Sequence, residues 1–212
     1  MALEATHIKF ALDFKDHFTL QNLDEYLAGT IYPDSRYRTG IARTKTHDDF
    51  LLDPTFATDD FKKGWMMHYI CDRAGNVAMD ELCADLQEGY PDRGAGTEWW
   101  VRATALKILI DFDILTHFDV KKYLPVLYTK NPCEESIEII RNYNGFISTM
   151  YLNEAVTTEN MKDMWAHFGI EEVLLNRVIT CTESYQHNVS IMKRVAKIYP
   201  RMIEVGLEFL KK

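Results

Sequence analysis

Apolar residues recur at helical spacing along almost the whole chain, and this pattern constrains the fold more than any other feature of the sequence. Alternation of apolar and polar residues, which is typical of half-buried strands, is nearly absent. Residues 8–14 are the only short strand candidate, and they could equally begin a helix. The sequence therefore predicts an all-α protein with a compact multi-helix arrangement.

Capping residues and polar segments between the apolar stretches predict where the helices begin and end. Capping residues are expected at Thr19, at Thr46 or Asp48, and at Thr157 or Thr158. A polar segment at 29–44 reads as a loop, and loops of that length tend to be functional. We expect helices over about 20–28, 58–73, 77–87, 98–116, 120–127, 133–151, 158–167 and 170–198, followed by a last helix with Pro200 near its first turn.

The chain has 212 residues and no internal repeat, low-complexity tract or Pro/Gly/Ser linker. This length suits one domain over residues 1–212 that can bury a large core without disulfides or metal. A Gly/Pro-rich turn at 88–96 separates a first half, about 1–90, from supporting helices over about 96–212. A metal ion in such a chain would therefore serve chemistry more than basic stability.

Charge and composition narrow the range of partners. The net charge is −8 and no run of Lys or Arg forms a basic patch, so long nucleic acids are disfavoured. No apolar segment approaches the length of a membrane span, and the N-terminus lacks the pattern of a secretory signal. The four widely spaced cysteines indicate reduced thiols of a cytoplasmic protein. The expected partner is a small-molecule substrate, and the composition is compatible with an oligomer.

The segment FKKGWMMHYICDR carries the strongest chemical signal. His68 and Asp72 are four residues apart, so both project from one helix face, where one imidazole and one carboxylate can bind the same ion. Phe61, Gly64 and Trp65 continue that face as an apolar stripe, and an unpaired carboxylate buried there would be costly. Gly64 costs about 1 kcal/mol against Ala in a helix interior, so we expect a close-packed neighbour or a bound group beside it. Taken alone, His68 and Asp72 could also be an ordinary side-chain pair.

Two upstream residues complete a candidate ligand set. Asp34 directly follows Pro33, and His47 lies thirteen residues further along. Asp34, His47, His68 and Asp72 together offer two oxygen and two nitrogen ligands, which suits zinc first, with iron, manganese or nickel as alternatives.

This order of residues resembles the zinc-dependent phospholipase C and single-strand nuclease superfamily. The matching pieces lie within residues 5–75: Pro33-Asp34, His47, and Gly64-Trp65 followed by His68 and Asp72, with His7 similar to that family's early histidine. The resemblance implies an all-helical fold and metal binding through Asp34, His47, His68 and Asp72. It implies metal-dependent hydrolysis, foremost of a phosphate ester.

Two departures limit what this resemblance implies. Secreted members hold further zinc ions with an N-terminal tryptophan amine and downstream histidines, whereas the N-terminus here offers no tryptophan. His167 and Glu171 have a suitable spacing, but we expect Gly169 to break the helix between them. We therefore expect one site and no trinuclear cluster, and phospholipid cleavage itself is not implied.

A second resemblance competes with the first. The residues His7, His47-Asp48 and Asp72 follow the H…HD…D order of the HD-domain phosphohydrolases, a helical metal-binding family that acts on nucleotides and related small phosphates. In that interpretation Asp48 replaces Asp34 as a ligand, and His68 lies outside the ligand set. His47 and Asp72 are common to both.

Other roles follow from hydrolysis by a metal-activated water. Asp48 or His7 could act as the general base or orient a ligand. The cations Arg36, Arg38 and Arg43 could hold a phosphate, or could simply pair with acids on a solvated loop. A third hypothesis is a non-enzymatic helical interaction protein with a structural metal.

Overall fold

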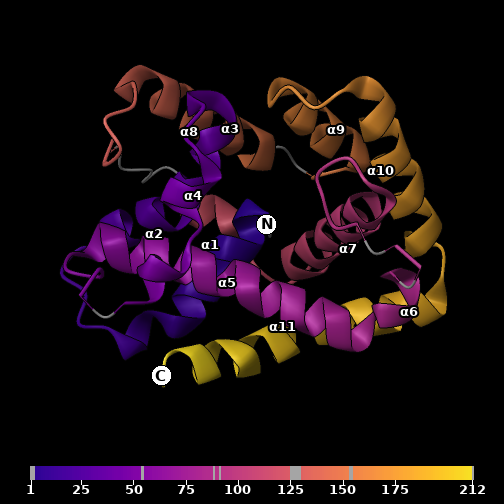
Figure 1. The fold of residues 1–212 in the computed structure, drawn as a ribbon, viewed down its shortest axis with the longest axis horizontal. Coiled ribbons are helices and arrows are strands. Elements are labelled where there is room, and N and C mark those ends of the chain that lie inside the picture. Colours follow the sequence, from indigo (N-terminus) through magenta and orange to yellow (C-terminus); the bar gives the residue numbers. More distant parts are fainter. Residues whose placement is uncertain are drawn as a thin grey trace. The chain divides into compact units, whose positions relative to one another are not determined.

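A computed structural model describes residues 3–53, 55–87, 89–90, 92–124, 130–152 and 155–211 of the chain, excluding the side chain of Gln87. Throughout these ranges the regular structure is α-helix or short 3-10 helix, with no strand, which confirms the all-α prediction (Figure 1). The strand candidate at 8–14 belongs to α1 (Glu4–Phe14). None of the described helices is both long and apolar enough to cross a membrane.

The chain divides into two compact units. The first contains Met1–Leu3, Arg73–His117 and Ala155–Lys212, and the second contains Glu4–Asp72 and Phe118–Glu154. The second unit draws on both halves of the sequence, so its limits do not coincide with the turn expected at 88–96, of which Glu88 and Pro91 lie outside the described residues. Every residue of the two candidate ligand sets lies in the second unit, and a single domain over residues 1–212 stays a prediction.

In the second unit a series of short helices surrounds the beginning of one long helix, α5 (Asp60–Leu82). The described elements besides α1 and α5 are η1 (Lys15–His17), α2 (Leu23–Ile31), η2 (Tyr32–Ser35), α3 (Arg36–Thr39), α4 (Arg43–Thr46), η3 (Asp49–Leu52), η4 (Val120–Lys122) and α8 (Ile137–Leu152). A largely aromatic core joins α2, η2, η3, α5 and α8, with Tyr32, Phe61 and Trp65 almost fully buried together with Leu51.

The crossing of α2 and α5 depends on two glycines. A Cβ atom on Gly64 would lie 1.8 Å from the carbonyl oxygen of Tyr26, and one on Gly29 would lie 1.9 Å from the carbonyl oxygen of Phe61. Both glycines therefore let the two helix backbones touch. This close-packed neighbour explains why a poor helix former occupies the interior of α5 at Gly64.

The predicted loop at 29–44 is wrong over most of its length. Helix α2 continues to Ile31, and η2 and α3 follow without a break until Gly40, whose φ of 74° ends α3. The start of α2 also differs from the prediction: Asn22 caps it in place of Thr19, because its side chain accepts the backbone N–H groups of residues 24 and 25. The Asp60 carboxylate accepts hydrogen bonds from the backbone N–H groups of residues 21 and 22, each with an N–O distance of 2.7 Å. These bonds keep the two residues outside the helix.

The first unit contains the end of α5 and five further described helices. Residues 73–82 continue α5 without interruption, so the predicted break before residue 77 is wrong; Gly75 packs on Met202, and Ala74 and Ala78 are fully buried. The other described helices are α6 (Ala84–Gln87), α7 (Glu98–Leu115), α9 (Thr158–His167), α10 (Glu172–Gln186) and α11 (Val189–Phe209).

Helix ends in the second half of the chain follow the predicted caps in part. Thr157 caps α9, as predicted, and Gly169 (φ 83°) follows the end of α9, as expected. Thr97, which was not among the predicted caps, caps α7 at the predicted start of that helix. The predicted helix at 170–198 is two helices, because the Asn188 side chain caps α11 at 189, and Pro200 lies inside α11 and not in its first turn.

Two predicted helices of the second unit are shorter than expected. Helix α8 begins at residue 137 and not at 133, since Glu134 has a φ of 65°, which a right-handed helix does not accept. The helix expected at 120–127 is a 3-10 turn at 120–122, and residues 125–127 lie outside the described residues.

Candidate metal centre

Five buried side chains of the second unit meet at one point. They are His7 from α1, Asp34 from η2, His47 directly after α4, and His68 and Asp72 from α5. None is more than 7% exposed. Figure 1 labels α1 and α5, which together supply His7, His68 and Asp72, and α4, which ends directly before His47; these segments lie far apart in the sequence. His68 and Asp72 share a face of α5, as their spacing predicts.

His68 is oriented by the backbone of α2. Its Nδ1 lies 2.7 Å from the carbonyl oxygen of Thr30, which can only accept a hydrogen bond. Nδ1 therefore carries the proton in the neutral ring, and the lone pair lies on Nε2. The contact depends on the close crossing at Gly64, because that crossing brings residue 30 of α2 onto α5.

His47 is oriented in the same way by the residue before it. Its Nδ1 lies 2.8 Å from the hydroxyl oxygen of Thr46, whose own proton is directed to the carbonyl oxygen of Arg43 at 3.3 Å. The hydroxyl therefore accepts from Nδ1–H, and Nε2 of His47 again carries the lone pair. Trp65 fixes this segment by donating its indole N–H to the carbonyl oxygen of Thr46 at 2.9 Å.

The two lone pairs face each other. Nε2 of His47 and Nε2 of His68 are 3.0 Å apart, so the pair repels unless a proton or a metal ion lies between them. The carboxylates of Asp34 and Asp72 lie 3.6 Å and 3.5 Å from Nε2 of His47. Several acceptor atoms thus converge on one point, which is more than a single shared proton satisfies.

These separations agree with a shared ion. Two ligand atoms about 2.1 Å from one ion lie about 3.0 Å apart at a right angle and about 3.4 Å apart at the tetrahedral angle. Nε2 of His47 lies 3.0 to 3.6 Å from the facing atoms of His68, Asp34 and Asp72, and Nε2 of His68 lies 3.9 Å from Asp34. The buried His and Asp groups of this cluster could therefore hold a metal ion.

His7 joins the cluster by stacking on the ring of His68. The two imidazoles stack with their centroids 3.8 Å apart, and Nε2 of His7 lies 3.7 Å from an Asp72 oxygen. Among the described residues, neither ring nitrogen of His7 has a hydrogen-bond partner. His7, His68 and Asp72 form a second group of potential ligands beside Asp34, His47 and His68.

Burial keeps the imidazoles in the form that binds metals. It lowers the pKa of His7 well below its usual value, and it lowers the pKa of His47 to about 2, with nearby His68 contributing in both cases. Both rings are therefore neutral near pH 7. Burial also raises the pKa of the Asp34 carboxyl, a cost that coordination of a cation would remove.

Two polar contacts beside the cluster were not predicted. Tyr143 of α8 is fully buried and donates its hydroxyl proton to the Glu4 carboxylate at 2.9 Å, and Tyr151 accepts the backbone N–H of Ala5 at 3.4 Å. Both contacts tie the start of α1, and with it His7, to α8. Their sequence separations of 139 and 146 residues leave no local pattern that could have revealed them.

The remaining predicted site residues are exposed or only partly buried. Asp48 is exposed, its carboxylate accepts the backbone N–H of Phe50 at 3.4 Å, and it belongs to none of the potential metal groups of the described chain. Arg36 is partly buried, and its guanidinium donates to the hydroxyl of Tyr37 at 2.7 Å. Arg38 and Arg43 are exposed.

Comparisons with models of known protein families, with curated proteins and with solved structures found no match to this chain.

Proposed function

We propose that this protein is a metal-dependent hydrolase of a phosphate ester. Asp34, His47, His68 and Asp72 hold its divalent ion, for which zinc is the first candidate. The pair of facing Nε2 lone pairs, 3.0 Å apart with both Nδ1 atoms anchored, is the observation that carries this proposal. Both carboxylates lie within 4 Å of Nε2 of His47, and Asp34 also lies 3.9 Å from Nε2 of His68, which supports a divalent ion over a shared proton.

A bound ion of this kind would lower the pKa of a coordinated water to about 7 and would polarise the phosphoryl oxygen. The protein supplies the orientation of the ligands: the Thr30 carbonyl and the Thr46 hydroxyl each fix one imidazole. His7 lies beside Asp72, and neither of its ring nitrogens has a hydrogen-bond partner among the described residues, so it would be placed to orient the attacking water or accept its proton, although burial makes the ring a weak base.

Arg36 is the best placed of the three arginines to bind the phosphate group. Its charge acts on the neighbouring Asp34 carboxyl and lowers the pKa of that group, against the larger opposing effect of burial. The guanidinium also stacks on Tyr37, with its central carbon 4.2 Å from the ring centroid, which holds the cation in place. Arg38 and Arg43 would contribute only to the attraction of an anionic substrate from solvent.

The exposed position of Asp48 argues against the HD-type ligand set, which needs that carboxylate beside His47. An HD-type phosphohydrolase of nucleotides stays the alternative, and nucleotides belong among the substrates to be tested. A helical interaction protein with a structural ion would instead close every coordination position with protein ligands. A cytoplasmic location is part of the proposal and is supported by the four cysteines, none of which forms a disulfide.

Elemental analysis of purified protein tests the metal site directly. We expect about one equivalent of zinc or another transition metal, lost in His68→Ala and in Asp72→Asn. Asp34→Asn should also lose metal, whereas Asp48→Asn, the matched control, should keep it. Metal-free protein that does not take up zinc, iron, manganese or nickel on addition would overturn the site, and loss of metal from Asp48→Asn alone would select the HD-type alternative.

Hydrolysis is tested separately on the metal-loaded protein with a phosphomonoester, a phosphodiester and a nucleotide. We expect one of these to be cleaved by the unaltered protein and not by Asp72→Asn. Metal binding without hydrolysis of any of the three would reject the enzymatic proposal in favour of the structural one.

A further inference from the structure

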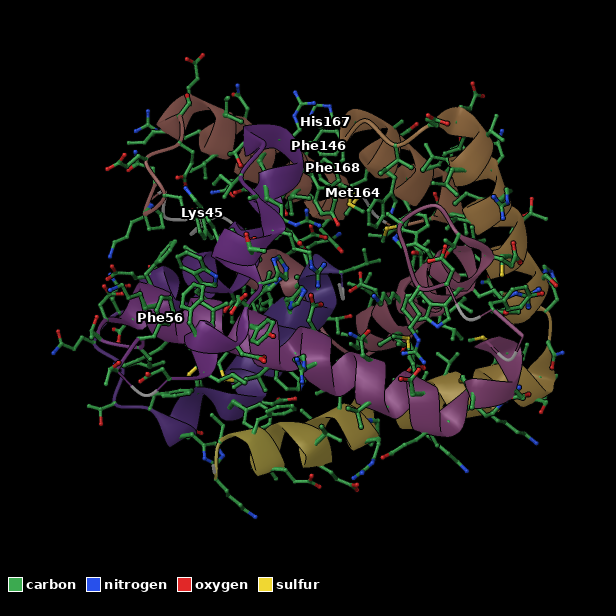
Figure 2. All side chains as sticks on the ribbon, viewed as in Figure 1. Lys45, Phe56, Phe146, Met164, His167 and Phe168 are labelled. Atoms are coloured by element: carbon green, nitrogen blue, oxygen red, sulfur yellow. The ribbon has the colours of Figure 1, made fainter. Side chains whose placement is uncertain are left out.

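A pocket of about 480 Å³ opens in the second unit, between η3, the start of α5 and the segment before α8. This volume is in the range of small-molecule sites. We call it the aromatic pocket, and its defining residues are Lys45, Phe50, Phe56, Lys62, Trp65 and Glu134. Figure 2 labels two of them, Lys45 and Phe56.

Three aromatic rings form the apolar part of the aromatic pocket. Phe56 meets Phe50 edge to face with their centroids 5.5 Å apart, and it meets Trp65 in the same manner at 5.4 Å. Phe50 is 44% exposed, although it is a large apolar side chain. A planar ring inserted against Phe50 would remove this apolar surface from water and extend the edge-to-face stack.

The polar part of the pocket favours an anion. Lys45 and Lys62 face one acid, Glu134, so the lining carries a net positive charge in a chain whose net charge is −8. The Lys62 ammonium lies 5.6 Å from the centroid of Phe56 and donates to the Thr58 hydroxyl at 3.3 Å, which positions it beside the rings.

The backbone at the pocket wall is strained. Glu134 has a φ of 65°, and it is the only non-glycine residue with a positive φ in the described part of the chain. Such conformations cost about 1–3 kcal/mol and cluster at binding sites. The strain places this wall, including Cys133, against the aromatic rings and delays the start of α8.

The aromatic pocket is separate from the metal centre. Trp65 lines the pocket and donates to the Thr46 carbonyl, and the Thr46 hydroxyl contacts His47 at Nδ1. The pocket thus lies on the Nδ1 side of His47, whereas the candidate metal ligands converge on Nε2. A ligand in this pocket would not touch the ion or the reacting phosphate.

A second pocket of similar size, about 470 Å³, lies between α7 and α10, but its lining offers no unpaired cation to an anionic ligand. Its cations are already paired, since Glu98 accepts from Arg102 at 3.0 Å and from Arg177 at 2.7 Å.

We propose that the aromatic pocket is a second ligand site, which binds a small planar aromatic anion between the Phe50–Phe56 edge and the ammonium groups of Lys45 and Lys62. The proposal concerns binding alone and does not depend on the metal or on hydrolysis.

Isothermal titration calorimetry with naphthalene-2-carboxylate, in the presence of a chelator, tests this site. We expect a dissociation constant of about 1 mM or tighter, the strength ordinary for a ligand of this size. Naphthalene-2-carboxamide, which has the same ring without the charge, should bind about tenfold more weakly, and inorganic phosphate should not compete.

Four variants locate the binding. The double variant Lys45→Gln/Lys62→Gln and the single variant Phe50→Ala should each weaken binding by about fivefold or more. Glu134→Gln should strengthen it about twofold to fivefold, a gain that misfolding cannot produce. Lys197→Gln, an exposed lysine of the other unit, should leave it unchanged.

Absence of binding at millimolar concentration would overturn the proposal. Binding that is insensitive to the lysine, Phe50 and Glu134 variants would place the ligand elsewhere and would overturn it as well.

Discussion

Replacing Gly64 by alanine tests the link between the α2–α5 crossing and the metal centre. Alanine gains about 1 kcal/mol in helix propensity over glycine. Its Cβ, however, would lie 1.8 Å from the Tyr26 carbonyl oxygen and 2.9 Å from the Thr30 nitrogen, both backbone atoms that cannot rotate away. Forcing the helices apart costs about 3 kcal/mol, the upper part of the usual range for overpacking. The net loss of unfolding free energy is therefore about 2 kcal/mol.

A loss of this size should lower the midpoint of thermal unfolding by about 4–8 °C, measured by circular dichroism at 222 nm. Separation of the helices also moves the Thr30 carbonyl away from Nδ1 of His68, now 2.7 Å distant, so zinc affinity should fall about tenfold. Gly75→Ala is the matched control in the same helix, since its Cβ would meet only the flexible end of Met202 at 3.4 Å. The reasoning is refuted if Gly64→Ala is as stable as Gly75→Ala and binds zinc normally.

Three further predictions follow from individual contacts. Thr46→Val removes the acceptor of the His47 Nδ1–H group and should weaken zinc binding about tenfold to a hundredfold, measured by competition with a chromogenic chelator. Pro200→Ala restores a backbone donor inside α11 and should raise the unfolding free energy by about 1–3 kcal/mol in urea titrations. Without metal, the free energy of unfolding should fall as the pH drops below about 6.5. In the unfolded chain His7 and His47 bind protons in this range, whereas in the folded protein their buried rings stay neutral. The slope should approach 1.4 kcal/mol per pH unit for each histidine, partly offset by the raised pKa of Asp34.

Each of these has its own control or contrary outcome. Thr39→Val removes a hydroxyl that donates to the Ser35 carbonyl, so it should leave zinc affinity intact. An unchanged unfolding free energy in Pro200→Ala would mean that α11 is adapted to the proline. For the pH prediction, metal-free stability that is constant between pH 7 and pH 5 would show that the two histidines are charged or exposed.

Helix positions were predicted well wherever a local signal decides them. The capping box of α9 at Thr157 depends on residues three apart, which a sequence displays. Predictions failed where a distant contact overrides the local signal. Asp60 holds the N–H groups of residues 21 and 22 outside α2, and Gly75 is tolerated inside α5 because it packs on Met202.

The polar segment at 29–44 shows the same limit. Its composition is that of a loop, yet Gly29 belongs to α2 because it is the contact point of α2 with Phe61 of α5. Asp34 follows in a buried 3-10 turn and not in an exposed loop.

The sequence by itself determined the helical class and paired His68 with Asp72, because helical spacing dictates which side chains share a face. His47 was expected beside them because it is common to the two family resemblances. Only the tertiary structure decided between Asp34 and Asp48 as neighbours of these residues, and brought His7 to them. Both decisions depend on where side chains of separate segments point once helices pack, which no local spacing encodes. The same packing fixed the imidazole protons on Nδ1, through a backbone carbonyl of α2 and the hydroxyl of Thr46, and so turned both Nε2 lone pairs toward one point.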